Sequence, residues 1–205
     1  METRPYRSQR RESAAAETRR VVLAAALAAF KEHGYGGATV AGIAASADVA
    51  VTTVYASVGG KPQLLVALIE DAAAASRQAL TAGRELDAAS AEEVLRRLGD
   101  IVSDRFREHG WLLSMVYSNT GADPVILEAM QQAEAVYSAR VADAARRIDD
   151  LGRLRTDVGV GDAADILWFY LGFRRWKVLL DRGWSPTRAR AWLGEQVATA
   201  ILAPA

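Results

Sequence analysis

Hydroxyl-bearing side chains recur within one short stretch of the chain, residues 39–61 (TVAGIAASADVAVTTVYASVGGK). The hydroxyls of Thr52 and Thr53 can hydrogen-bond base edges, and their methyl groups can pack against thymine. Thr39 precedes an apolar run, where its hydroxyl can accept from backbone N–H groups and a helix N-terminus favours an anion. The stretch Val51–Val58 contains no Arg, Asn or Gln. These residues therefore offer polar recognition without a bidentate base reader, so that any specificity would depend on DNA shape as well.

Two short helices joined by a tight turn are expected to position these hydroxyls. The first covers Val40–Ser46 and the second covers Val51–Val58, with Asp48 tolerating a left-handed conformation in the turn. Thr52, Thr53 and Tyr55 then point outward. A short helix, a turn and a second helix are the layout of a helix-turn-helix, whose second helix enters the major groove of DNA. The side chains expected to be buried are Ile43, Ala44, Val49 and Val54.

Composition favours an all-α protein of one or two domains. The chain has 205 residues, 51% of them hydrophobic and many of those alanine, and it has only 5 prolines. The absence of cysteine excludes disulfides and thiolate metal sites and suits a cytoplasmic location. The two histidines lie far apart without a carboxylate cluster, so no enzyme activity, metal or cofactor is expected.

No apolar stretch reaches the 20 or so residues of a membrane span, and the charged N-terminus excludes a signal peptide.

Charge is distributed unevenly along the chain. Residues 1–62 carry 8 Lys and Arg against 5 Asp and Glu, whereas the remainder carries 17 against 20. Residues 1–12 contain four arginines and are expected to form a disordered basic arm. This arm is either a solvated tail or a cationic segment that reaches phosphates or the minor groove.

Helical periodicity, capping residues and glycine or proline breaks predict the remaining elements. His33 and His109 each precede a glycine, and each pair is expected to end a helix. No strand is expected. The predicted helices are Ser13–His33, Lys61–Thr81, Ser90 to about Glu108, Trp111–Tyr117, Asp123 to about Asp150, Asp162–Asp181 and Thr187–Leu202.

The region Thr18–Leu68 resembles the DNA-binding domain of the TetR family of bacterial transcriptional regulators. The residues that carry this resemblance are Phe30-Lys31-Glu32-His33-Gly34-Tyr35, Thr39, Ile43-Ala44, Ala47, Val49, Val54-Tyr55, Lys61 and Leu64. The family usually has glycine at Asp48, serine or threonine at Ala50, and an aromatic residue followed by Phe at Ser57-Val58. Losing the cap at Ala50 would cost the second helix about 1 kcal/mol. A second resemblance runs from Leu151 through Pro186, in the C-terminal part of the family.

The resemblance implies a three-helix DNA-binding domain over residues 13–62 and a helical effector-binding and dimerisation domain over residues 63–205. It implies that Tyr55, Lys61 and Thr39 contact phosphates. The expected DNA-binding residues are Thr39, Val51, Thr52, Thr53, Tyr55, Ser57 and Lys61.

The resemblance also implies a body that encloses a small, apolar or aromatic effector and pairs with a second copy through the last two helices. Periodicity leaves open which of Trp168, Phe169 and Phe173 face a pocket and which face the partner. The expected effector-binding residues are Trp111, Met115, Tyr117, Asn119, Tyr137, Arg140, Trp168, Phe169 and Phe173. The expected dimer contacts are Ile166, Tyr170, Phe173, Arg174, Trp176, Lys177, Trp192, Leu193 and Val197.

These features predict a one-component transcriptional regulator, most simply a repressor, that binds double-stranded operator DNA as a homodimer. The alternative is a helical ligand-binding or scaffold protein of the same fold that has lost DNA binding, as the departures at Ala50 and Val58 would allow.

Overall fold

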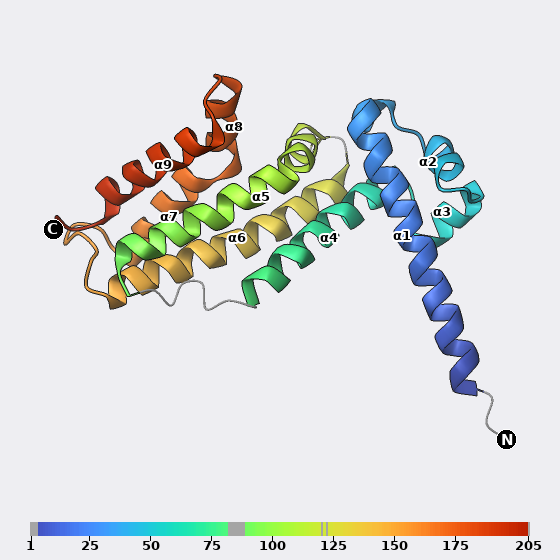
Figure 1. Cartoon of the computed structure of the whole chain (residues 1–205), viewed down its shortest axis with the longest axis horizontal. Helices are drawn as coiled ribbons and strands as arrows, with labels where there is room; N and C mark the ends of the chain where they lie inside the picture. Colours follow the sequence, from blue (N-terminus) through green and yellow to red (C-terminus); the bar gives the residue numbers. More distant parts are fainter. Residues whose placement is uncertain (1–3, 82–88, 120, 122, 205) are drawn as a thin grey trace. The chain divides into compact units, whose positions relative to one another are not determined.

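The computed structural model describes residues 4–81, 89–119, 121 and 123–204, and it is helical nearly throughout (Figure 1). Within those residues the only β-type pairing is an isolated bridge between Leu154 and Leu202. The prediction of an all-α fold is therefore confirmed. The helices are α1 (Arg4–Gly37), α2 (Val40–Ser46), α3 (Val51–Ser57), α4 (Lys61–Thr81), α5 (Ala91–Asn119), α6 (Pro124–Asp150), α7 (Val160–Leu171), α8 (Phe173–Asp181) and α9 (Pro186–Ile201).

Helix α1 begins at Arg4, inside the segment predicted to be a disordered basic arm (residues 1–12). Pro5 is compatible with this start, because a residue in the first helical turn has no intrahelical acceptor for its N–H group. The arginines and alanines that follow favour a helix, and no glycine interrupts them. The described part of the predicted arm, residues 4–12, is therefore helical. Residues 1–3 lie outside the described part of the chain.

The two His-Gly pairs have different structures. Gly34 adopts a left-handed φ of 68° that interrupts α1, as predicted. Gly110, in contrast, lies inside one continuous helix α5, where the sequence predicted a break and a separate helix Trp111–Tyr117. Two further glycines follow Gly34 within three residues, whereas helix-forming residues follow Gly110. A glycine in a helix costs only about 1 kcal/mol relative to alanine, which flanking residues and packing can offset.

Gly172 divides the predicted helix Asp162–Asp181 into α7 and α8. Its backbone is extended, with φ −66° and ψ 148°. A Cβ atom at this position would lie 2.8 Å from the carbonyl oxygen of Trp168, so only glycine fits without a shift of the backbone. The predicted single helix was wrong, because the helical spacing of apolar residues continues on both sides of Gly172 and gives no sign of the break.

Caps at the other helix ends follow the sequence closely. The N–H group of Val125 donates to the Asp123 carboxylate at 2.9 Å, and the N–H group of Arg188 donates to the Ser185 hydroxyl at 3.2 Å. Each cap precedes a proline at the start of its helix, as predicted for α6 and α9.

Two compact units make up the chain. Unit 1 comprises residues 1–73 and 114–131, and unit 2 comprises residues 74–113 and 132–205. The boundary predicted after Pro62 therefore falls inside unit 1, which also takes in the first part of α4 and the α5–α6 connection. Helices α5 and α6 each contribute residues to both units.

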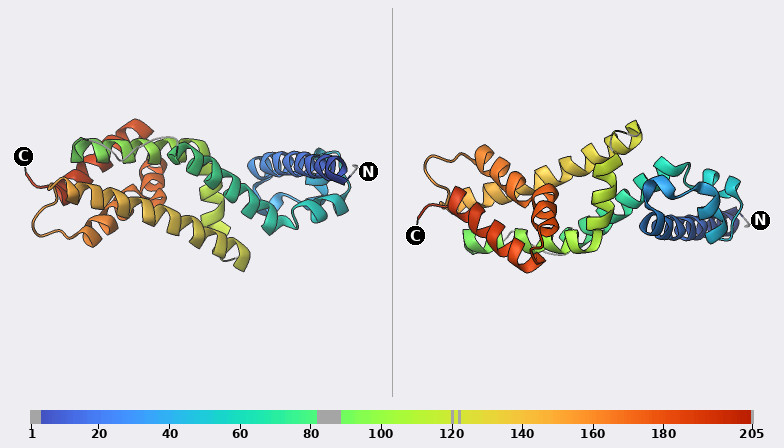
Figure 2. Two further views of the ribbon diagram at one scale, coloured as in Figure 1. Left: turned by 90° about the horizontal axis from the view of Figure 1, so that it is seen from below. Right: turned by 90° about the horizontal axis from the view of Figure 1, so that it is seen from above.

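Each unit has its own buried apolar residues. In unit 1, helices α1, α2 and α3 pack against one another and bury Val22, Ala26, Phe30, Ile43, Ala44 and Val54. In unit 2, α7 packs against α8 and α9, and the three helices can be followed in the right-hand view of Figure 2. Their inward residues join those of α5 and α6 in one core that includes Leu98, Val102, Ala144, Ile148, Leu167, Trp176, Leu193 and Ile201.

No single helix in the described part of the chain is long and apolar enough to cross a membrane. Helices α2 and α3 pass the same test of length and composition only when taken together, and they meet at a bend of 99°.

Candidate nucleic-acid interface

The turn between α2 and α3 has the predicted geometry. The Thr39 hydroxyl accepts a hydrogen bond from the N–H group of Gly42 at 3.1 Å and caps α2. Ile43 and Ala44 are buried on the inner side of α2. Asp48 has a φ of 52°, so it supplies the left-handed residue that redirects the chain into α3. The local signals in the sequence therefore place the start of α3 correctly.

Helix α3 is anchored by one buried side chain and exposes the opposite face. Val54 is fully buried, whereas 42% of Val51 and 55% of Tyr55 are exposed. Thr52 is exposed and Thr53 is half-buried. Together these side chains give α3 an outward face on which methyl, hydroxyl and phenol groups can meet another molecule.

The two ends of α3 lie at Ala50 and at Ser57-Val58, where the sequence departs from the pattern of the family that it resembles. Ala50 occupies the N-cap position in extended conformation and makes no side-chain cap, so the N–H group of Thr53 donates to the Ala50 carbonyl at 2.9 Å. The helix ends at Ser57, one position before the predicted end, and the Ser57 hydroxyl donates to the Val54 carbonyl at 3.2 Å. The Ser57 hydroxyl is therefore engaged within α3.

Lys61 joins the start of α4 to the end of α1. Its ammonium group donates to the carbonyl oxygens of Tyr35 at 2.8 Å and Ala38 at 3.2 Å, with a longer contact to Gly36 at 3.5 Å. It also lies 4.7 Å from the centroid of the Tyr35 ring. Sequence reasoning missed this contact, because it joins residues 26 positions apart. A phosphate contact by Lys61 stays a prediction.

The predicted effector-binding residues are distributed over both units. Met115, Tyr117 and Asn119 belong to unit 1, and the Asn119 side-chain amide donates to the Met115 carbonyl at 2.7 Å. Phe173 is half-buried in unit 2, where its ring meets that of Phe106 edge to face at 5.2 Å. The other members in unit 2 are Trp111, Tyr137 and Arg140, which are half-buried, and Trp168 and Phe169, which are each 44% exposed.

Three of the predicted dimer contacts are buried within the chain's own core. Trp176 is 1% exposed, Leu193 2% and Val197 1%, and all three belong to the core of unit 2. Their assignment to the interface was wrong, because a helical sequence marks an apolar face without saying what covers it. Unit 2 also exposes apolar side chains. The sequence had singled out Trp168, Phe169 and Trp192 among them, but not Val136, Val178 and Leu180.

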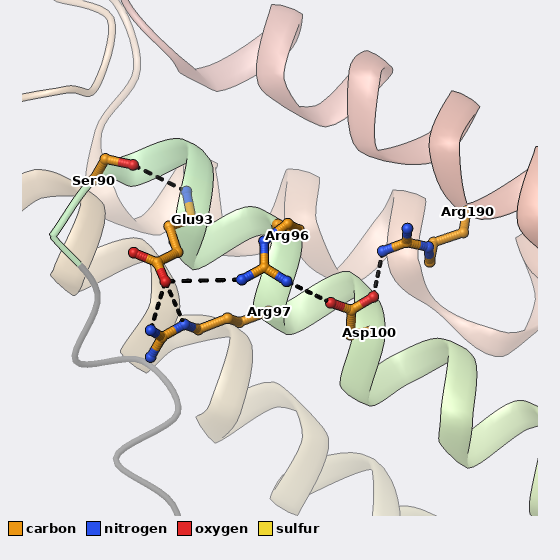
Figure 3. A network of polar contacts seen from close by, with 6 residues as sticks. All are labelled: Ser90, Glu93, Arg96, Arg97, Asp100 and Arg190. Carbon is orange, nitrogen blue, oxygen red and sulfur yellow. Dashed lines mark hydrogen bonds and ion pairs between the residues drawn. The ribbon is translucent and has the colours of Figure 1, made fainter.

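A chain of ion pairs runs along α5 and reaches α9 in unit 2 (Figure 3). Asp100 pairs with Arg96 at 3.0 Å and with Arg190 of α9. Glu93 accepts from Arg97, and this hydrogen bond holds the pKa of Glu93 below its ordinary value. Because these groups are partly exposed to solvent, the network orients α5 and α9 without a large contribution to stability. No group of three or more His, Cys, Asp or Glu that could hold a metal occurs among the residues described.

Comparison with known proteins gives a family match and several structural relatives. Residues 22–68 match the sequence profile of the TetR family of bacterial regulatory proteins. Among curated protein sequences, none matches the chain. The profile match covers α2, α3 and part of the helices α1 and α4 on either side. This region contains the Thr39 cap, the Asp48 turn and the buried Val54.

Solved structures share the fold over nearly the whole chain. A proposed transcriptional regulator from Saccharomonospora viridis in complex with choline has 20% identity and a TM-score of 0.78, covering 92% of this chain and 100% of its own. A TetR transcription regulator from Haloarcula marismortui has 20% identity and a TM-score of 0.75 over the same shares. SmeT, the repressor of the Stenotrophomonas maltophilia multidrug efflux pump SmeDEF, has 24% identity and a TM-score of 0.69, covering 90% of each chain. Residues 22–68 therefore belong to the DNA-binding region of the TetR family of bacterial regulatory proteins, and the chain as a whole shares its fold with these solved structures.

Proposed function

We propose that the chain is a transcriptional repressor, not an enzyme, and that a small apolar or aromatic effector lowers its affinity for operator DNA. The observation that carries this proposal is the exposed face of α3, with Val51, Thr52 and Tyr55 outward over the buried Val54. A surface helix that follows a capped helix and a left-handed turn has the layout that enters a major groove.

Recognition by α3 depends on small groups. The Thr52 hydroxyl offers a donor and an acceptor to base edges, and its methyl group can meet thymine. Because α3 contains no Arg, Asn or Gln, DNA shape contributes to specificity. Tyr55 and Thr39 meet phosphates on either side of the groove, and these contacts fix the register of the helix.

A homodimer supplies the second half-site. One helix-turn-helix contacts too few bases for useful affinity, and paired heads read two half-sites about one helical turn apart. Trp168, Phe169 and Trp192 are large, exposed and apolar, which is the composition of a homodimer interface. They lie on α7 and α9, which pack together in unit 2.

Effector binding is supported by the half-buried aromatic residues of the chain and by its structural relatives. The Saccharomonospora viridis protein holds choline, and SmeT is a repressor of a multidrug efflux pump. An effector releases the operator only if it binds the DNA-competent and the released conformations with different affinities.

Fluorescence anisotropy with labelled DNA from the chain's own upstream region tests the proposal. The measurement compares about 50 and 200 mM salt, because phosphate contacts make affinity fall steeply with salt. We expect Thr52→Ala to weaken binding by about 5- to 100-fold. The matched variant Thr156→Ala, at an exposed position in the connection between α6 and α7, should bind as the wild type does.

A ligand-binding or scaffold protein is the second candidate, and the uncapped start of α3 at Ala50 favours it. It predicts no sequence-selective binding at either salt concentration. Equal affinity for upstream and unrelated DNA would therefore overturn the repressor and leave this candidate.

A further inference from the structure

Trp176 carries a buried hydrogen-bond donor that has no acceptor within the described chain. The side chain is 1% exposed, and its Nε1–H group reaches no oxygen or nitrogen of the described residues. A buried N–H group without a partner is disfavoured, because folding removes its hydrogen bonds to water without replacing them. Native proteins rarely keep such a group unless a bound molecule or a water satisfies it.

The surroundings of this donor are aromatic. The Trp176 ring meets the ring of Phe106 edge to face at 5.6 Å, and Phe106 meets Phe173 in the same way at 5.2 Å. Tyr137 packs against the same core, and its hydroxyl is buried. Ring edges and faces at these separations also suit an aromatic ligand.

The helix that carries Trp176 is short and is bounded by two glycines. Helix α8 has 9 residues, too few to be stable without tertiary contacts. Gly172 precedes it in extended conformation, and Gly183 follows it with a φ of 83°. Gly172 and Gly183 are therefore the positions at which a movement of α8 that admits a ligand to Trp176 would begin.

We propose that Trp176 Nε1–H is the polar contact of an effector site in unit 2, and that the effector is an uncharged aromatic compound bearing a carbonyl oxygen. An indole N–H group can only donate, so the ligand must supply an acceptor. The side chains named around the Trp176 ring are aromatic and apolar, so a carboxylate placed against them would lose its hydration without a cation beside it. The inference rests on the proposed function, because it names the chemical class of the effector.

Two probes of nearly the same shape test the donor. Acetophenone has a carbonyl oxygen where α-methylstyrene has a CH₂ group. Protein labelled with ¹⁵N at its 5 tryptophans gives separate indole N–H signals in an NMR spectrum. The signal that is lost in Trp176→Phe belongs to the buried Trp176, and the signal that is lost in Trp192→Phe belongs to the exposed Trp192. We expect acetophenone to move the Trp176 signal downfield, because its oxygen accepts the hydrogen bond. We expect α-methylstyrene to cause no such downfield shift. The Trp192 signal should stay in place with both compounds.

Binding constants give a second measurement. The preference for acetophenone over α-methylstyrene should be about 5- to 10-fold larger in the wild type than in Trp176→Phe, which is the effect of one buried hydrogen bond. Trp184→Phe, at a half-buried tryptophan outside both proposed sites, should keep the wild-type preference. If Trp176→Phe does not fold, the shift of the wild-type signal decides the question.

Two results would overturn the inference. One is a Trp176 signal that keeps its chemical shift at every acetophenone concentration up to the solubility limit. A signal that is already downfield without acetophenone, because a buried water accepts the hydrogen bond, counts as this result. The other is an equal response to both probes. Operator anisotropy separates the two proposals: an unmoved signal in a protein that binds its operator refutes the site alone, whereas absent operator binding refutes the repressor.

Discussion

Replacing Lys61 with methionine separates a structural role from a DNA contact. The change keeps most of the apolar stem and removes the ammonium group, which donates to the carbonyls of Tyr35 and Ala38 and contacts the Tyr35 ring. Three ammonium protons meet three carbonyl oxygens when the longer Gly36 contact is counted. A phosphate could bind Lys61 only by displacing one of these acceptors.

The loss in stability follows from these contacts. A hydrogen bond to a charged group contributes about 1.5–3 kcal/mol, and a cation over an aromatic ring at a partly exposed site contributes about 0.5–1 kcal/mol. Because Lys61 is only half-buried and its contacts share one ammonium group, we count one hydrogen bond and the ring contact, each at its lower value. We expect Lys61→Met to lower the free energy of unfolding by about 2 kcal/mol and the urea midpoint by about 1 M.

Urea denaturation and the salt dependence of operator binding provide the assay. If Lys61 only joins α4 to α1, the slope of log affinity against log salt stays at its wild-type value. If it contacts phosphate in each protomer, the slope falls by about 1.8 for the dimer. Lys31→Met, at an exposed position on α1, is the matched control and should shift the midpoint less than Lys61→Met does. A wild-type midpoint for Lys61→Met together with a reduced slope would refute the reasoning.

Three further changes test the capping of α3, the α7–α8 break and the interface. Ala50→Ser should raise the free energy of unfolding by about 1 kcal/mol in urea denaturation by adding the missing cap; an unchanged midpoint would argue against it. Gly172→Ala should lower stability by about 1–3 kcal/mol, because its Cβ would lie 2.8 Å from the Trp168 carbonyl oxygen, whereas Gly194→Ala has open space in α9 and should be neutral or stabilising. Equal effects in the two glycine variants would contradict the steric reasoning. Trp168→Lys should weaken self-association at least tenfold by sedimentation, and an unchanged dimer would remove α7 from the interface.

The helix-turn-helix could be predicted because its signals are local. A hydroxyl at Thr39 caps the helix that follows within three residues, and Asp48 tolerates a left-handed turn in its own backbone. The buried anchor Val54 could be placed because a helix of known start fixes which side chains share a face. Such features need no knowledge of distant residues.

Glycine breaks could not be predicted as reliably, because neighbours in space decide them. Gly34 and Gly110 both follow histidine, yet only Gly34 leaves the helical conformation. Gly172 breaks a helix where no break was predicted, and the nearest atom to its missing Cβ is the Trp168 carbonyl oxygen. The Lys61 contact with Tyr35 has the same origin: family resemblance implied a phosphate partner, whereas the fold supplies carbonyl oxygens from a distant helix.

Cores and interfaces in a helical protein use the same apolar and aromatic residues, so the sequence could not separate them. Trp176, Leu193 and Val197 follow helical periodicity as an interface would, but the chain's own helices already cover them. Trp168 and Trp192 follow the same periodicity and remain 44% and 39% exposed. Exposure, and not residue type, is therefore the ground on which these two tryptophans are proposed for the dimer interface.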